Sequence, residues 1–131
     1  MKEKVKLSVT LPASPDVIYK AWLNGKEHTK FTGEETKSSA KKGGEFLAGG
    51  GYMSGKNLEL DPGKKIVQSW RSTEFPKDAE DSRLELQLEK SGKGTKLTLI
   101  HSDIPEGQKD MYKQGWKEFY FKPMKKYFKD K

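Results

Sequence analysis

The sequence contains no cysteine, which excludes a disulfide framework and a zinc site built on thiolates. Histidine is nearly as rare, with two residues, whereas a zinc site needs about three or four nitrogen, sulfur or oxygen ligands. No apolar run approaches the ~18 residues of a membrane span, and the N-terminus carries no apolar segment typical of a secretory signal. We therefore expect a cytoplasmic protein that holds no metal or other cofactor and does not enter a membrane.

Arginine is scarce for a basic protein. The formal net charge is +7, yet 24 of the 26 basic residues are lysine, and only Arg71 and Arg83 are arginine. Bidentate recognition of bases and phosphates favours the arginine guanidinium, whereas lysine acts as a solvated point charge. The charge excess therefore does not indicate a nucleic-acid partner.

The 131 residues suit one domain spanning residues 1–131, since most domains contain ~100–150 residues. Alternation of apolar and polar residues predicts β-strands, and glycine-rich or proline-containing turns separate them. The predicted strands cover residues 5–11, 52–60, 65–73, 84–88 and 95–102. Their close spacing and short turns predict an antiparallel meander.

Apolar residues at helical spacing predict three helices. Ser14 can cap a short helix, and Asn24-Gly25 ends it before a second short helix at residues 26–32. The longest predicted helix covers residues 108–128, and we expect Pro123 to kink it. One face of this helix carries Tyr112, Trp116, Phe119, Tyr120, Pro123, Met124 and Tyr127. Because a sheet with one apolar face needs a cover, we expect this aromatic face to pack on the sheet.

Several short motifs follow one another from the first predicted strand to the last helix. They are Leu11-Pro12-Ala13-Ser14-Pro15, Phe31-Thr32-Gly33, Gly43-Gly44-Glu45-Phe46, Leu58-Glu59-Leu60-Asp61-Pro62, Ile66-Val67-Gln68-Ser69-Trp70-Arg71, Ile104-Pro105, Gln114-Gly115-Trp116 and Phe119-Tyr120-Phe121. In this combination the chain resembles the C-terminal domain of the activator of heat-shock protein 90 ATPase family, within the START-like (birch-pollen-allergen-like) superfamily. The resemblance implies an α+β helix-grip fold, in which a curved antiparallel sheet carries two short helices and a long C-terminal helix packed across it.

The resemblance also implies a function. The expected role is that of a non-enzymatic partner-binding domain, a co-chaperone-like modulator of a heat-shock protein 90 type ATPase in the stress response. Two alternatives from the same superfamily stay open. One is the binding of a small hydrophobic ligand in a cavity between sheet and helix, and the other is cyclase-like catalysis.

Aromatic residues at apolar positions could line such a cavity. Small-molecule pockets are concave and mostly apolar, with a few polar anchors. The candidates are Trp22, Phe31, Phe46, Tyr52, Trp70, His101, Trp116, Phe119 and Tyr120. Large aromatic side chains also fill ordinary cores, so the sequence leaves open whether the grip is hollow or filled.

No arrangement of residues predicts a catalytic site. His101 lies by parity on the apolar face of its strand and could act as a general acid or base with Asp103 or Glu45. We favour a hydrogen-bonded core histidine instead. Residues 50–56 fit the first seven positions of a phosphate-binding P-loop, but Asn57 stands where Ser or Thr should hold magnesium. A glycine-rich hairpin is the interpretation that we favour.

Positive charge is concentrated on the last predicted helix, where residues 109–131 contain eight lysines against three acidic residues. We expect these lysines to form a solvated outer face that steers an acidic protein partner. Arg71 follows Trp70 on its strand and should point the opposite way, to solvent or to a loop. The candidate partner surface consists of Arg71, Lys113, Lys117 and Lys125.

Overall fold

The computed structural model describes residues 2–129, and a seven-stranded antiparallel sheet is its central element. The strands are β1 (Glu3–Leu11), β2 (Lys37–Ser38), β3 (Glu45–Ala48), β4 (Met53–Asp61), β5 (Lys65–Ser72), β6 (Ser82–Ser91) and β7 (Gly94–Ile104). Their order across the sheet is β1-β7-β6-β5-β4-β3-β2, so every neighbouring pair except β1–β7 is consecutive in the chain. The predicted antiparallel meander is confirmed.

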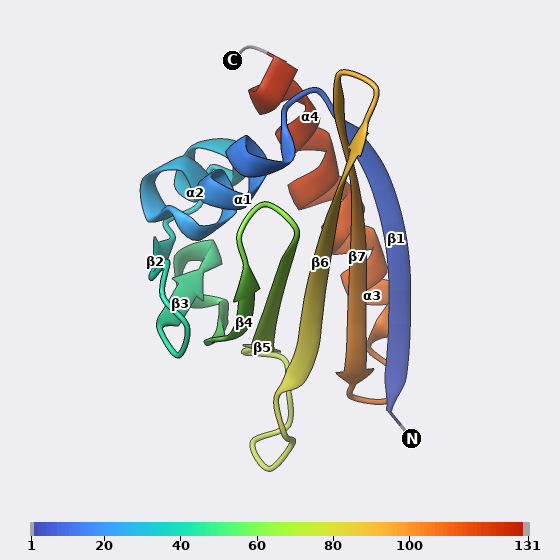
Figure 1. The fold of residues 1–131 in the computed structure, drawn as a ribbon. Coiled ribbons are helices and arrows are strands. Elements are labelled where there is room, and N and C mark those ends of the chain that lie inside the picture. Colours follow the sequence, from blue (N-terminus) through green and yellow to red (C-terminus); the bar gives the residue numbers. More distant parts are fainter. Residues whose placement is uncertain (1, 130–131) are drawn as a thin grey trace.

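Helices pack against this sheet from two parts of the chain. Two short helices, α1 (Pro15–Leu23) and α2 (Gly25–Thr32), follow β1. The C-terminal helical segment joins α3 (Lys109–Gly115), a π-helical stretch (Trp116–Phe121) and α4 (Lys122–Lys129). Figure 1 shows this segment running along β6, β7 and β1. The α+β helix-grip arrangement is therefore confirmed. Within residues 2–129, no helix is long and apolar enough to cross a membrane.

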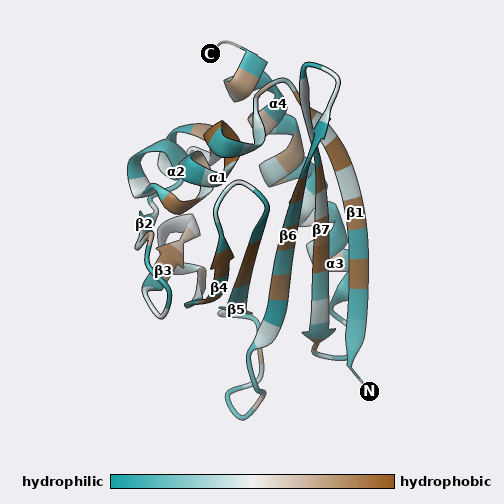
Figure 2. Ribbon diagram, viewed as in Figure 1, coloured by the Kyte–Doolittle hydropathy of each residue, from teal (hydrophilic) through white to brown (hydrophobic). Residues whose placement is uncertain are grey.

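The core lies between the sheet and the helices. On β6 and β7 the inward positions face each other in register, with Leu86 opposite Leu99 and Leu88 opposite Leu97. All four leucines are buried, and burying such a side chain stabilises the fold by roughly 1.5–3 kcal/mol. The alternation is visible as bands of hydrophobic and hydrophilic colour along these strands (Figure 2). The strand period of two thus sets which face the helices cover.

The junction between α1 and α2 is built by one polar residue. Asn24 ends α1, and its Oδ1 accepts hydrogen bonds from the amides of Lys26 (2.9 Å) and Glu27 (3.1 Å) at the start of α2. Gly25 follows because the chain passes close to β2: a Cβ at this position would lie 2.8 Å from the Thr36 carbonyl oxygen. The predicted stop at Asn24-Gly25 is therefore also the N-terminal cap of the next helix.

The C-terminal segment departs from a regular α-helix at one place. Over Trp116–Phe121 the backbone winds as a π-helix, and the Lys122 amide donates to the Lys117 carbonyl, five residues back. Pro123 follows directly, and it has no amide to donate to the Phe119 carbonyl. The irregularity expected at Pro123 thus takes the form of a wider turn on its N-terminal side.

The wider turn changes which side chains face the sheet. Regular helical spacing predicted Phe119 on the packed face, but Phe119 is 70% exposed. Tyr120 and Phe121 are buried instead. A π-helical turn holds more residues than an α-helical turn, so the inward direction after Trp116 falls later in the sequence. The expectation that Phe119 packs on the sheet is therefore wrong.

Candidate functional site

A pocket of about 390 Å³ lies between the sheet and the C-terminal helical segment, and we call it the aromatic pocket. Its buried aromatic residues are Trp70 from β5, Tyr112 from α3, and Trp116 and Tyr120 from the π-helical stretch, whereas Phe119 and Met111 are exposed. Its lining consists of Thr32, Glu34, Gly49, Tyr52, Met53, Trp70, Met111, Tyr112, Gly115, Trp116, Phe119 and Tyr120. The volume falls within the range of about 300–1,000 Å³ typical of small-molecule pockets.

The nine candidate cavity residues divide into two groups. Five of them line the aromatic pocket: Tyr52, Trp70, Trp116, Phe119 and Tyr120. Trp22, Phe31 and His101 are buried in the core instead, with at most 4% of each exposed. Phe46 is half-buried on β3, opposite Gly55 of β4. The candidates therefore do not line one common cavity: five of them line the aromatic pocket, and three are packed in the core.

The remaining pocket residues were not among the sequence candidates. Met111 and Gly115 precede Phe119 at steps of four, a spacing that places all three on one side of a helix. This repeat of four lies one residue before the aromatic repeat of Tyr112, Trp116 and Tyr120, which predicted the packed face. Glu34 lies in the loop after α2, Gly49 begins a 3-10 turn (Gly49–Gly51), and Met53 is the first residue of β4, so no periodicity indicates the direction of these side chains.

His101 is fully buried, and its tautomer follows from its partners. The Trp116 indole Nε1 donates to His101 Nδ1 at 3.2 Å, so Nδ1 carries no proton. His101 Nε2 lies 2.7 Å from Ser82 Oγ, and Ser82 donates its own proton to the Trp70 carbonyl. The imidazole is therefore neutral and protonated at Nε2. The suggested pairing with Asp103 or Glu45 is wrong, because both ring nitrogens have other partners.

His28 is buried in a similar setting but holds the opposite tautomer. Its Nδ1 lies 2.9 Å from the Trp22 carbonyl oxygen, which can only accept, so Nδ1 carries the proton. Its Nε2 then accepts from the Tyr120 hydroxyl at 2.8 Å. Trp116 and Tyr120, four residues apart, thus attach the π-helical stretch to β7 and α2 through one histidine each.

Burial disfavours the charged form of both imidazoles. Desolvation lowers the pKa of His28 from 6.5 to about 4, against a smaller raising effect of the Trp22 carbonyl. Desolvation also lowers the pKa of His101 from 6.5 to about 3. Neither ring nitrogen of His101 is free to exchange a proton with a ligand. His101 therefore acts as a structural hydrogen-bonding group and not as a general acid or base.

Tyr112 anchors α3 at the edge of the aromatic pocket. Its hydroxyl lies 2.5 Å from Ser72 Oγ and donates to Gln108 Oε1 at 2.8 Å. Burial is the main cause that raises the pKa of Tyr112 to about 12, and burial likewise raises the pKa of Tyr120. Both phenols stay neutral in the physiological range, so they contribute hydroxyls and ring faces but no charge.

The candidate partner surface is split by the structure. Lys113, Lys117 and Lys125 are exposed on the C-terminal helical segment. Arg71, by contrast, holds the loop between β5 and β6: its guanidinium donates to Asp81 at 2.6 Å and to the Pro76 and Ala79 carbonyls at 3.2 and 3.0 Å. Of the two orientations expected for Arg71, solvent or loop, the structure shows the loop.

The P-loop-like residues 50–56 enter β4 and are not followed by a helix, as the hairpin interpretation predicted. Asn57, at the eighth position, is buried and donates to the Ser39 and Lys41 carbonyls at 2.7 and 3.0 Å. It therefore secures a loop and does not face a phosphate site. Among the described residues, no three His, Asp or Glu side chains come together as a metal site would require.

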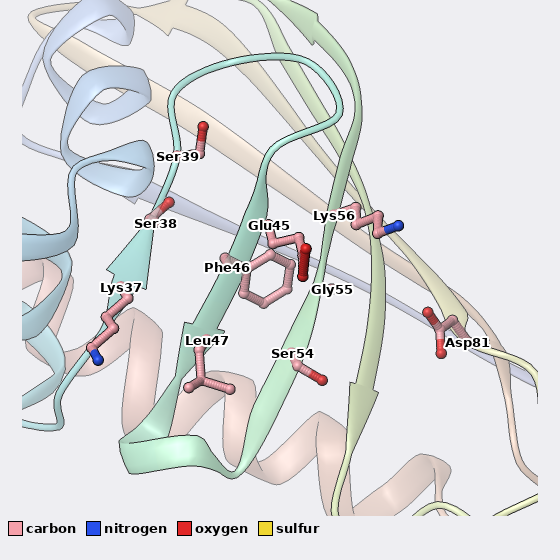
Figure 3. A pocket seen from close by; sticks show the side chains of 10 residues that line it. All are labelled: Lys37, Ser38, Ser39, Glu45, Phe46, Leu47, Ser54, Gly55, Lys56 and Asp81. Carbon is pink, nitrogen blue, oxygen red and sulfur yellow. The ribbon is translucent and has the colours of Figure 1, made fainter.

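A second hollow, of about 580 Å³, lies over β2, β3 and β4. Figure 3 shows the Phe46 ring next to Gly55 in this hollow, with charged side chains around it. Both signs of charge are present, since Lys37 and Lys56 stand with Glu45 and Asp81. The aromatic pocket differs because its lining includes no basic residue.

The fold and the pocket define the class of protein: a START-like helix-grip domain. Among solved structures, an HSP90 activator from Plasmodium falciparum superposes with a TM-score of 0.82 at 22% identity, covering 89% of each chain. The Aha1 dimer from Colwellia psychrerythraea gives a TM-score of 0.79 at 19% identity and covers 96% of each chain. At these identities the likeness concerns the fold.

The family is identified by sequence. The chain belongs to the Activator of Hsp90 ATPase homolog 1-like protein family, whose model matches residues 12–129. It is 29% identical over 125 residues to the human activator of 90 kDa heat shock protein ATPase homolog 1, and 31% identical over 114 residues to the homolog from Dictyostelium discoideum. These matches cover 95% and 86% of this chain but 37% and 30% of the relatives. The chain thus corresponds to about a third of each relative.

Proposed function

We propose that this chain is a non-enzymatic partner-binding domain that modulates a heat-shock protein 90 type ATPase. Membership of the activator family is the observation that carries the proposal. The exposed Lys113, Lys117 and Lys125 on the C-terminal helical segment offer a positive surface for an acidic partner. Catalysis is not part of the proposal, because the buried histidines have both ring nitrogens engaged.

The test is a calorimetric titration of this protein into the heat-shock protein 90 homologue of its own source, with and without nucleotide, at two salt concentrations. Saturable binding that depends on nucleotide and weakens with salt supports the proposal. A parallel assay measures ATPase turnover at saturating concentration of this protein. Absence of binding at high micromolar concentration would overturn the proposal, and binding without any change in turnover would remove the modulating role.

A matched pair of variants locates the contact. Lys113→Gln/Lys117→Gln removes two charges from α3 and the π-helical stretch. Lys4→Gln/Lys6→Gln removes two exposed charges from β1, on the sheet face opposite to Val5 and the helices. We expect the first variant to weaken binding about threefold to tenfold, since exposed charge pairs contribute ~0.2–1 kcal/mol each. The second variant should bind like the parent.

A second candidate function is the binding of a small apolar ligand, and the aromatic pocket is the observation that favours it. The buried Trp70 and Trp116 give the pocket an apolar wall, and its volume of about 390 Å³ would hold a compact ligand. Native mass spectrometry of the purified protein tests this candidate. A reproducible added mass that disappears on denaturation supports it, whereas a clean unliganded mass, together with no binding of added apolar compounds, would count against it.

A further inference from the structure

We propose that the aromatic pocket selects organic cations, in which an ammonium group is carried on a short apolar body. The proposal rests on the second function above and names its ligand class. The proposal is based on the lining of the pocket, which contains six aromatic residues, a single carboxylate and no basic residue. This occurs in a chain with 26 lysines and arginines among 131 residues.

The aromatic rings form a continuous cluster. The ring centroids of Trp70 and Tyr112 are 5.0 Å apart, those of Trp70 and Trp116 are 5.7 Å apart, and those of Trp116 and Tyr120 are 4.9 Å apart. Phe119 adds a ring that is 70% exposed and therefore accessible to a ligand. The face of an aromatic ring is negative, and a cation within about 6 Å of the ring centroid is attracted to it.

Glu34 supplies the charge. It follows α2, lies exposed and lines the pocket, where it is the one acidic residue and no basic residue accompanies it. The lining residues Tyr112 and Tyr120 stay neutral there, because burial raises the pKa of each phenol. Two larger hollows of the described surface carry lysines. The hollow over β2–β4 includes Lys37 and Lys56, and another near α1 and α2 includes Lys20, Lys26 and Lys37.

The net charge of the chain acts in the opposite direction. At +7 the protein as a whole repels cations and attracts anions, but this long-range field is screened over about 8 Å at physiological ionic strength. A preference for a cation must therefore arise from contacts inside the pocket. Added salt should weaken the non-specific binding of anions to surface lysines.

Methyl NMR with three matched probes tests the proposal. Hexyltrimethylammonium, hexanol and hexyl sulfate share one chain and differ in head-group charge. Met53 and Met111 line the pocket, and Met124 is buried outside the lining, so labelled methionine methyls report where each probe binds. We expect the cation to shift Met53 and Met111 but not Met124. Its affinity should exceed that of hexanol about threefold to tenfold, as cation–π contacts and one carboxylate would supply.

Two variants assign the preference to named groups. Glu34→Gln removes the carboxylate charge at nearly constant shape, and Glu35→Gln makes the same change at an exposed neighbour that does not line the pocket. Phe119→Leu removes the exposed ring but keeps an apolar side chain. We expect Glu34→Gln and Phe119→Leu each to lower the ratio of cation affinity to hexanol affinity about twofold to fivefold. Glu35→Gln should behave like the parent.

The outcomes separate the ligand class from the ligand function. Equal binding of the cation and hexanol, unaffected by Glu34→Gln, would overturn the cation preference while retaining an apolar ligand pocket. Tightest binding of hexyl sulfate at Met53 and Met111 would also overturn it. If none of the three probes shifts these methyls at millimolar concentration, the ligand-binding function fails together with the proposal.

Discussion

Trp116 donates its indole N–H to Nδ1 of the fully buried His101, across 3.2 Å. This contact joins the π-helical stretch to β7 and fixes the tautomer of the imidazole. A proton added to His101 Nδ1 would meet the indole N–H, so two donors would face each other at a fully buried residue. Packing of the C-terminal segment and neutrality of His101 are therefore two aspects of the same hydrogen bond.

Trp116→Phe should be strongly destabilising. The change leaves His101 Nδ1 buried without a donor, which costs roughly 1–3 kcal/mol, and the missing ring atoms add a cavity. We expect a total loss of about 2–4 kcal/mol in the free energy of unfolding, measured by urea denaturation. Phe119→Leu is the matched control on the same turn: Phe119 is 70% exposed, so its change should stay within about 0.5 kcal/mol. Equal effects of the two variants would contradict this assignment.

Stability should fall between pH 6.5 and pH 4.5. Burial lowers the pKa values of His28 and His101 to about 4 and about 3, so on acidification the unfolded chain takes up protons before the folded one. The two neutral histidines contribute their full stabilisation above pH 6.5, and this contribution is lost as the pH falls toward their pKa values in the folded state. The slope should approach ~1.4 kcal/mol per pH unit for each histidine.

The histidine contribution can be isolated by measurement. Urea unfolding at pH 7.5, 6.0 and 5.0 gives the slope for the parent, and His101→Gln should reduce it by about half. Glutamine can still accept from Trp116 and donate to Ser82, so the variant keeps the hydrogen-bond pattern. Glu85, whose pKa is lowered from 4.5, titrates below this window. Constant stability from pH 7.5 to 5.0 would show that the buried imidazoles do not control it.

Two glycines should respond in opposite directions to alanine. Gly115 is helical, and a Cβ there would meet only Phe119 Cδ2 at 3.9 Å, so Gly115→Ala should stabilise by about 0.5–1 kcal/mol. Gly55 of β4 is crowded, because a Cβ would overlap the Ser69 carbonyl oxygen and lie 2.6 Å from Phe46 Cε2. Gly55→Ala should therefore destabilise by ~2 kcal/mol or more. Thermal melts measure both effects: Gly115→Ala should raise the melting temperature and Gly55→Ala should lower it. An unchanged or higher melting temperature for Gly55→Ala would show that the crowding at this position is easily relieved.

Arg71→Lys should loosen the loop between β5 and β6. The guanidinium bonds to Asp81 and to the Pro76 and Ala79 carbonyls at once, and a single ammonium cannot reproduce this fork. We expect faster amide hydrogen exchange over residues 76–81, with a global cost of about 0.5–1.5 kcal/mol. Arg83→Lys affects an exposed pair with Glu85 and should leave exchange in that loop unchanged. Identical exchange in both variants would contradict the anchoring role.

The regular elements could be predicted from the sequence because their signals are local. Alternation on β6 and β7 identifies the inward leucines, and Ser14 and Asn24 mark helix starts through caps within three residues. The family resemblance then supplied the overall arrangement, which the fold confirms. Direction on the last helix was the exception, since counting in α-helical steps cannot anticipate the π-helical turn that moves Phe119 outward and Phe121 inward.

The pocket could be predicted only in part, because its boundary depends on distant packing. Trp22 and Trp70 look alike in sequence, yet Trp22 is in the core and bonds to Gln68, whereas Trp70 lines the aromatic pocket. His28 gave no sequence signal of burial; its role follows from contact with Tyr120, far along the chain. Whether an aromatic residue is packed in the core or lines the pocket is decided only when α2, β5 and the C-terminal segment pack together.

The strand order has a consequence for how the chain acquires its structure. β2 to β7 pair with their sequence neighbours and can form as they leave the ribosome, but β1 pairs only with β7, for example Leu7 with Leu99. Of the described strands, β1 is thus synthesised before the others but pairs only after β7 has emerged. Long-range pairing of this kind slows folding, because the intervening chain must be ordered before the contact is made. Until β7 is available, the apolar side chains of β1, including Val5 and Leu11, are exposed to solvent, although they are buried in the folded chain.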